Sequence, residues 1–115
     1  MEPKIFTSWR LPVQLTIRKL DGDNYAQWER VVKMALIGYG RQRHLYENAP
    51  NHNDPMHDKW VQDDAHIISL MWNSMENKIA NLCSHVETFN TLWYHLHHLF
   101  GSNLIRMYDA SREFF

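Results

Sequence analysis

The segment from Leu20 to Gly40, LDGDNYAQWERVVKMALIGYG, constrains the fold more than any other part of the chain. Its start predicts a turn at Asp21-Gly22, because glycine readily adopts positive φ and aspartate bonds to nearby backbone. Asn24 follows at the position expected of a helix N-cap, and Gln27 stands three residues later, where a capping-box partner belongs. A helix is therefore expected to begin directly after Asn24.

The apolar residues of this helix recur at spacings of three and four, so they lie on one face. They are Tyr25, Trp28, Val32, Ala35 and Tyr39. Gly38 and Gly40 predict the helix end, because glycine takes the left-handed conformation that closes many helices. Two large aromatic rings on one face require a core that forms around them.

The composition is that of one globular domain. The chain has 115 residues, of which 44% are apolar and 22% charged. Its formal net charge of −1 provides no large excess of cations that would attract nucleic acid or anionic lipid. Cys83 is the only cysteine, so no internal disulfide is expected. With no apolar run of membrane-spanning length and no signal peptide, we expect a cytoplasmic protein with no membrane span.

Residues 1–19 show no helical period and are expected to form an extended N-terminal arm. Leu11, Val13, Leu15 and Ile17 alternate with polar residues, which predicts one buried and one exposed side. Such an unpaired edge either packs on its own domain or pairs with another molecule. Residues 20–115 are expected to form the helical domain.

The rest of the chain predicts further amphipathic helices after a long polar loop. One begins near Pro55 or Asp58, and its apolar stripe is Trp60, Ile67, Ile68, Met71, Trp72 and Met75. Ser74 is expected to cap a short helix from Glu76 to about Cys83, with Ile79 and Leu82 facing inward.

Thr88 is expected to cap a helix that runs to Phe100 and stops at Gly101. Its apolar stripe is Phe89, Leu92, Trp93, Leu96, Leu99 and Phe100. A last helix is expected from Asn103. The predicted fold class is therefore all-α, a small bundle of four to five helices. Trp28, Trp60, Trp72 and Trp93 are expected to be buried, and Trp9 more exposed.

The residues that carry chemistry do not form a catalytic or metal motif. His95 and His98 share a helix face, and Cys83 and His85 lie in the preceding link, but no zinc-binding spacing is present. Solvent-facing histidines are the better interpretation. No nucleophile motif, phosphate loop or dinucleotide fingerprint occurs. We therefore expect no enzyme, no cofactor, no bound metal and no small-molecule substrate.

A small basic cluster suggests an alternative role in binding single-stranded RNA. Arg41, Arg43 and His44 lie between Tyr39 and Tyr46, and basic residues interleaved with aromatics can contact phosphates and stack on bases. Three cations give little affinity at physiological salt, so only weak RNA binding is expected.

Asp64 is expected to be buried at the edge of its helix stripe, one turn after Trp60. A carboxylate there needs a hydrogen-bond donor, because an unpaired buried charge is costly. The expected donors are the indole N–H of Trp28 or Trp60, the Tyr25 hydroxyl, a free N–H at a helix N-terminus, and Arg30 or Arg106. Asp64 would then fix the placement of the first two helices. The alternative is that it faces water beside Asp63.

Five motifs in order resemble the Gag polyprotein of copia-type LTR retrotransposons. Leu20-Asp21-Gly22-x-Asn24-Tyr25-x-x-Trp28 resembles the family's L-D-G-x-N-Y-x-x-W start. The later motifs are similar to W-x-x-x-D, N-S-[ML], T-A-x-x-[IL]-W-x-x-L and R-[IM]-Y. In the same order, the matching residues are Trp60 and Asp64; Asn73, Ser74 and Met75; Thr88, Trp93 and Leu96; and Arg106 and Tyr108. Phe89 departs from the pattern, since the family usually has alanine there.

The resemblance implies a capsid-like N-terminal lobe, without the family's second lobe and zinc knuckle. Such a lobe would be a structural, self-associating domain and a homo-oligomer in particle assembly. The last helix would either fold back on the bundle or mediate contacts between copies through Leu104, Tyr108, Phe114 and Phe115. The alternatives are an RNA-binding or chaperone fragment of Gag and a domesticated adaptor that binds a host protein.

Overall fold

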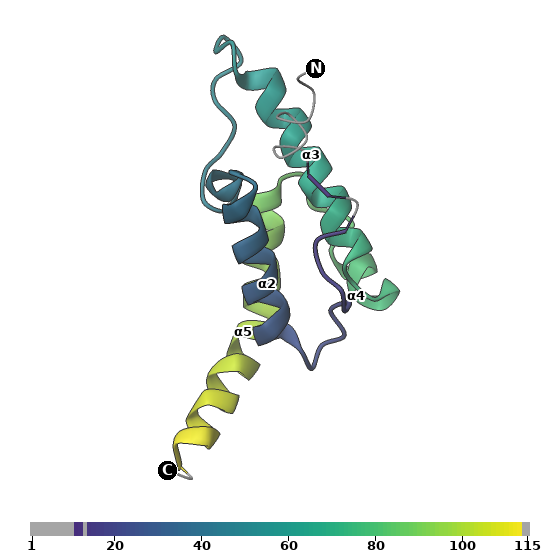
Figure 1. Cartoon of the computed structure of the whole chain (residues 1–115), viewed down its shortest axis with the longest axis vertical. Coiled ribbons are helices and arrows are strands. Elements are labelled where there is room, and N and C mark those ends of the chain that lie inside the picture. Colours follow the sequence, from purple (N-terminus) through teal and green to yellow (C-terminus); the bar gives the residue numbers. More distant parts are fainter. Residues whose placement is uncertain (1–10, 13, 114–115) are drawn as a thin grey trace, which may run out of the picture.

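The computed structural model describes the backbone of residues 11–12 and 14–113, and the side chains of these residues up to 101. Over this part, the chain forms four α-helices, one 3-10 helix and no strand (Figure 1). The elements are α2 (Tyr25–Gly38), η1 (Gln42–Leu45), α3 (His57–Asn73), α4 (Asn77–Leu82) and α5 (Phe89–Glu113). The all-α prediction is confirmed, and η1 is a short element that the sequence did not predict. No helix in this part is both long and apolar enough to cross a bilayer.

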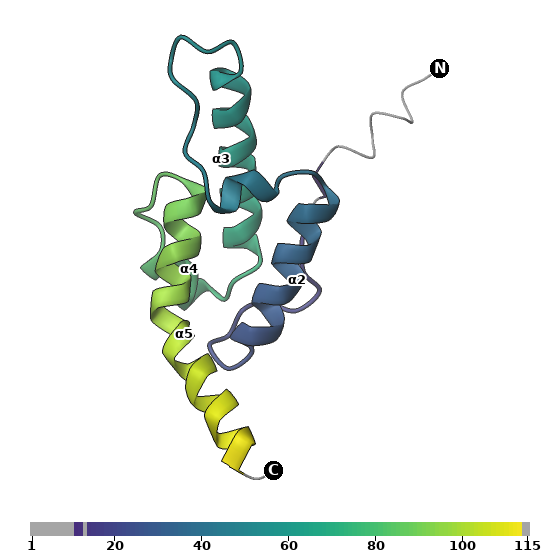
Figure 2. The same ribbon diagram turned by 90° about the vertical axis from the view of Figure 1, so that its left-hand side faces the viewer.

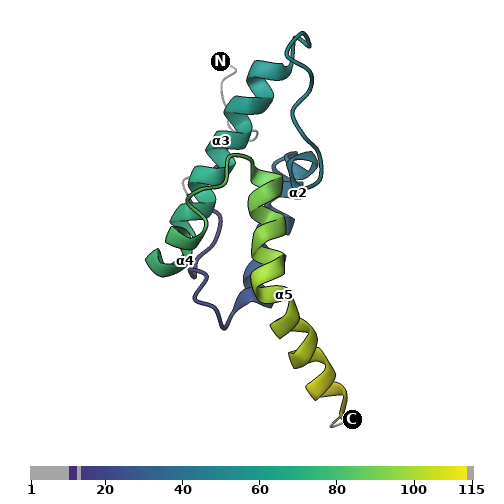
Figure 3. The same ribbon diagram turned by 180° about the vertical axis from the view of Figure 1, so that it is seen from behind.

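Helix α5 forms the centre of the bundle. Its first half packs against α2, η1 and α3 (Figure 2). The side chains that fill the centre are Leu20, Val32, Leu36, Ile67, Met71, Phe89, Leu92 and Leu96, all of them fully buried. The backbone of the second half of α5 extends away from the other helices in all three views (Figure 3). It therefore does not fold back on the bundle.

Helix α2 begins where predicted, but its capping differs. The Asn24 side chain makes no hydrogen bond to the helix; its Oδ1 accepts from the Asp21 N–H at 3.0 Å and its Nδ2 donates to the Lys19 carbonyl at 2.9 Å. The predicted capping box is therefore wrong. Asn24 instead closes the preceding turn, in which Gly22 has a φ of 100°. At the other end Gly38 is still helical, and only Gly40, with a φ of 72°, takes the left-handed conformation.

The carbonyl of Ser74 joins the start of the domain to the end of α3. It accepts from the Leu20 N–H at 2.8 Å and from the indole Nε1 of Trp28 at 3.0 Å. The Glu76 N–H then donates to the Leu20 carbonyl at 3.0 Å, which completes a parallel bridge between Leu20 and Met75. The Ser74 carbonyl therefore fixes the position of the segment that leads into α2. It also holds the inner face of α2 against the end of α3.

The expected alternation of the N-terminal arm is wrong. Leu15 and Thr16 are both buried, whereas the Ile17 side chain is 96% exposed. The backbone bends at residues 15, 17 and 18, so the period of two that a strand would impose is lost. Val13 lies outside the described residues.

The two helices predicted at the end of the chain, one running to Phe100 and one starting at Asn103, form a single helix. Helix α5 continues through Gly101, although Gly101 was expected to end it. Glycine permits a left-handed helix end but does not force one, and no proline follows it here. Gly101 is buried, and a Cβ at this position would meet the His97 ring at 3.3 Å. Gly101 therefore continues the helix, and a side chain here would require the exposed His97 ring to shift slightly.

The predicted role of Ser74 as the cap of α4 is also wrong. Ser74 is the C-cap of α3, and its hydroxyl donates to the Met71 carbonyl at 2.7 Å. The N-cap of α4 is Glu76. Of the two residues expected to face inward from α4, Ile79 is buried but Leu82 is exposed.

Aromatic stacking links α2 to α5. The Trp28 and Trp93 rings stack with centroids 6.3 Å apart, and Tyr25 stacks on Phe100 at 5.5 Å. Trp28 and Trp93 are buried as predicted. Trp60 and Trp72 are half-buried, and Trp9 lies outside the described residues. Burial, with Glu29 beside the hydroxyl, raises the pKa of Tyr25 well above its ordinary value.

Two tryptophans of α2 and α3 provide a matched test of the Ser74 junction. Trp28→Phe removes the donor to Ser74 but keeps an aromatic ring, so it should lower the free energy of unfolding by about 1–3 kcal/mol. Trp72→Phe removes a buried indole N–H that has no acceptor among the described residues, so it should be neutral or stabilising. Urea unfolding measures both. Equal losses in the two variants would contradict the assigned hydrogen bond.

Candidate interaction surface

The buried carboxylate of Asp64 joins three elements. Asp64 lies on α3 and is only 7% exposed. Its Oδ1 is 2.9 Å from the His44 Nδ1 on η1, and its Oδ2 accepts the Phe89 N–H at the start of α5, also at 2.9 Å. The first N–H groups of a helix lack intrahelical partners and carry partial positive charge, so a carboxylate is favoured there.

The prediction that Asp64 is buried and hydrogen-bonded is confirmed, and of the donors left open the structure shows a free N–H at a helix N-terminus. The predicted consequence is wrong, because Asp64 connects α3 with η1 and α5 rather than with α2. His44 was not among the expected donors. Its burial follows from the 3-10 turn, which directs both His44 and Leu45 inward.

Each residue of the basic cluster has a partner inside the domain. Arg41 pairs with Asp63 at 3.4 Å, and Arg43 pairs with Glu47 at 2.9 Å. The Arg43 guanidinium also lies 5.7 Å from the centre of the Trp60 ring. The His44 ring stacks on Trp60 at 3.9 Å and is buried. The cluster is thus part of the packing around Trp60, and the His44 ring is turned away from solvent.

A histidine bonded to a carboxylate also occurs in catalytic sites, where the carboxylate orients a general base. Here a hollow of about 450 Å³ borders His44 and Trp60. Its other lining residues are Gly40, Arg41, Arg43, Glu47, Asn48, Pro50, Asp54, Met56, Lys59 and Asp63, with no serine, threonine or cysteine. His44 is only 4% exposed, and its ring is held between the Asp64 carboxylate and the Trp60 ring.

Several of the motif residues contact one another or the same junctions of the domain. The Leu20 N–H and the Trp28 indole both donate to the Ser74 carbonyl, and the Trp28 ring stacks on Trp93. The Asp64 carboxylate accepts the N–H of Phe89, the residue after Thr88. Leu96 lies in the core. Thr88 stands directly before α5 as expected of its cap, and its carbonyl accepts the Leu92 N–H at 3.1 Å, but its hydroxyl bonds to the side chains of Asn90 and Thr91 rather than to the helix backbone. The side chains of Leu104, Arg106 and Tyr108, and all of Phe114 and Phe115, lie outside the described residues.

Helix α2 carries a second apolar face, which sequence reasoning missed. Val31, Met34 and Ile37 are all exposed, and Met34 is 60% exposed. Met34 and Ile37 lie on the side opposite the buried Trp28, Val32 and Leu36, and Val31 lies at the edge between the two sides. Their spacing of three residues in the sequence was the signal that could have predicted this second face. Ile17 and Val31 both border a hollow of about 400 Å³, which extends the apolar face toward the N-terminal segment. We call Ile17, Val31, Met34 and Ile37 the α2 outer surface.

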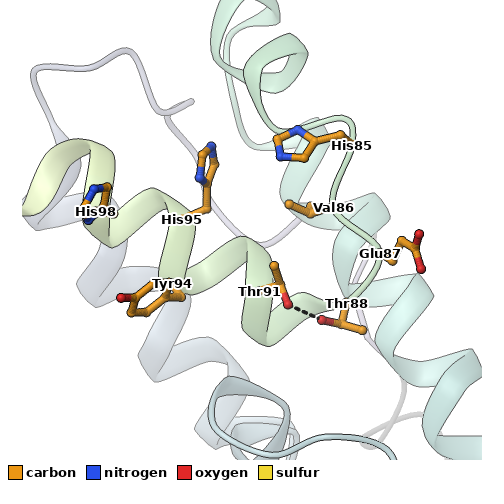
Figure 4. A pocket seen from close by; sticks show the side chains of 8 residues that line it. All are labelled: His85, Val86, Glu87, Thr88, Thr91, Tyr94, His95 and His98. Carbon is orange, nitrogen blue, oxygen red and sulfur yellow. Dashed lines mark hydrogen bonds between the residues drawn. The ribbon is translucent and has the colours of Figure 1, made fainter.

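A third hollow, of about 530 Å³, lies between α5 and the link that precedes it (Figure 4). Its lining residues are His85, Val86, Glu87, Thr88, Thr91, Tyr94, His95 and His98. Within the described part of the chain, no group of three or more His, Cys, Asp or Glu side chains is arranged to hold a metal ion. Cys83, next to this link, is buried, and burial raises the pKa of its thiol.

Comparison with known proteins gave no match to a family model, to a curated protein or to a solved structure. Function is therefore inferred from the contacts and surfaces of the described residues, together with the resemblance of the motifs.

Two adjacent aspartates test the role of Asp64. Asp64→Ala leaves the Phe89 N–H and His44 without their acceptor, so it should lower the free energy of unfolding by about 1–3 kcal/mol. Asp63→Ala removes only partly exposed ion pairs with Arg41 and Lys59, so it should cost less than about 1 kcal/mol. Chemical denaturation at neutral pH compares them. An Asp64→Ala variant as stable as Asp63→Ala would show that the carboxylate does not support the fold.

Proposed function

We propose that this chain is a self-associating structural domain, a capsid-like lobe of a copia-type Gag protein that makes weak contacts with copies of itself. The observation that carries the proposal is the α2 outer surface. A helix in a monomeric bundle normally buries one apolar stripe and exposes a polar one. Helix α2 has apolar residues on both sides, so its outer side is suited to a protein partner.

The surroundings of this surface favour a second copy as the partner. The net charge of −1 means that two copies repel each other only weakly. Gly38 lies next to the surface with no neighbouring side chain or backbone atom within 4 Å of where its Cβ would lie, so another helix can approach closely. A surface that meets its own copy about a twofold axis needs only self-complementarity, which a short apolar helix face provides.

The motif contacts support the same proposal. Two of the motif residues, Trp28 and Asp64, make the side-chain hydrogen bonds of the two junctions, at Ser74 and at the start of α5. These contacts give a physical reason for such residues to recur together in a lobe of this kind. The resemblance therefore involves residues that determine the fold and is not limited to exposed positions.

RNA binding has less support as the main role. Arg41 and Arg43 pair with carboxylates, and His44 is buried against Asp64. Phosphate binding would have to compete with these internal ion pairs. An adaptor that binds a host protein would use the same α2 outer surface, and the experiment below distinguishes it by the absence of self-association.

The oligomeric state of matched surface variants tests the proposal. Wild-type protein should show an average mass that rises with concentration in sedimentation and light scattering, and Met34→Glu should abolish the rise. A charge placed within an apolar contact is desolvated without a partner. Leu82→Glu is the control, because Leu82 on α4 is 58% exposed and lies outside the α2 outer surface.

The control should self-associate like wild type. Wild-type protein that remains monomeric across the concentration range would contradict self-association. The α2 outer surface would then be a binding site for a different protein. Equal loss of association in Met34→Glu and Leu82→Glu would contradict the choice of surface.

A further inference from the structure

Two histidines face each other at the third hollow, one from the α4–α5 link and one from α5 (Figure 4). The rings of His85 and His95 have centroids 5.4 Å apart and planes at 86°. We propose that this pair binds a divalent transition-metal ion of the zinc, nickel or copper class. Imidazole is a preferred ligand of these ions, whereas magnesium and calcium prefer oxygen.

The spacing of the two rings fits one metal ion. Zinc–nitrogen bonds are about 2.0 Å long, so two imidazoles on one tetrahedral ion have ring centres about 5 Å apart. The observed separation of 5.4 Å is close to this value. The two rings are thus already at a separation compatible with one ion, and the side chains have to rotate from their edge-to-face arrangement to direct one nitrogen of each ring to it.

Both rings are available to a ligand. Neither His85 nor His95 has a hydrogen-bond partner among the residues that the structure describes. No lysine or arginine lines the hollow, and Glu87 is its one carboxylate. A cation therefore meets no repulsive charge from the walls of the hollow.

The backbone on both sides holds the pair in place. His85 stands between Cys83 and Val86, which are both buried in the core. The Val86 N–H donates to the Cys83 carbonyl at 3.4 Å, which turns the link so that His85 faces α5. His95 lies one residue before the fully buried Leu96. A bound ion would therefore fasten the link to the helix.

The pair supplies two protein ligands, and water completes the coordination. His98 lines the same hollow but stacks on Tyr94 with centroids 6.5 Å apart. A site with two histidines binds more weakly than a structural zinc site, which usually has four protein ligands. Binding requires neutral imidazole, so it should weaken as the pH is lowered.

Zinc titration of the full chain tests the proposal, with isothermal calorimetry for affinity and thermal unfolding for stability. Zinc should raise the melting temperature at pH 7.5 and magnesium should not, because an ion that binds only the folded state stabilises it. His85→Gln and His95→Gln should each weaken zinc binding about tenfold or more. His66→Gln, at an exposed position of α3, should leave affinity unchanged.

A second histidine pair provides the rival site. His52 and His57 stack with nearly parallel planes and centroids 4.5 Å apart, which is closer than the spacing of about 5 Å expected of two imidazoles on one ion, and the His57 Nδ1 donates to the Pro50 carbonyl at 2.8 Å, so only its Nε2 is left for a ligand. His52→Gln should therefore leave zinc affinity unchanged. Zinc binding that survives His85→Gln, or that is lost in His52→Gln, would overturn the proposal. His85 is exposed, so His85→Gln is expected to fold and gives a result even where His95→Gln does not.

Discussion

The carboxylate of Asp64 is the interaction on which the packing of this domain depends. It lies within the bundle and accepts hydrogen bonds from η1 on one side and from the first N–H of α5 on the other. A buried charge of this kind is tolerated only with donors in place, so the three elements are specified together. His44 also fixes the start of the long loop between η1 and α3, and Asn90 of α5 holds the loop further on, at Glu47 and Asn48.

The Ser74 carbonyl makes a second junction further along α3. It receives the N–H of Leu20 and the indole of Trp28, which places α2 against the C-terminal end of α3. With Asp64 holding α5 and Ser74 holding α2, the two helices meet through the Trp28–Trp93 stack. The inner face of α2 is then fully used, and its outer face, with Met34, is left at the surface.

Periodicity predicted the helices and most of the core, because burial of one stripe per helix is a local property of the sequence. It failed where a residue has two compatible roles. Asn24 bonds to the turn rather than to the helix, and Gly101 continues α5 rather than ending it. The burial of His44 depends on Asp64, which is 20 residues away, and no local pattern reports such a contact. The α2 outer surface was visible in the spacing, but a single stripe was assumed.

Hydrogen exchange at the Phe89 amide tests most directly whether Asp64 organises the domain. The first N–H groups of a helix normally lack a partner and exchange rapidly. If Asp64 caps α5 from α3, the Phe89 amide should exchange far more slowly than the amide of Asn90, and Asp64→Asn should reduce that protection. A Phe89 amide that exchanges as fast as that of Asn90 in the wild-type protein would contradict the account.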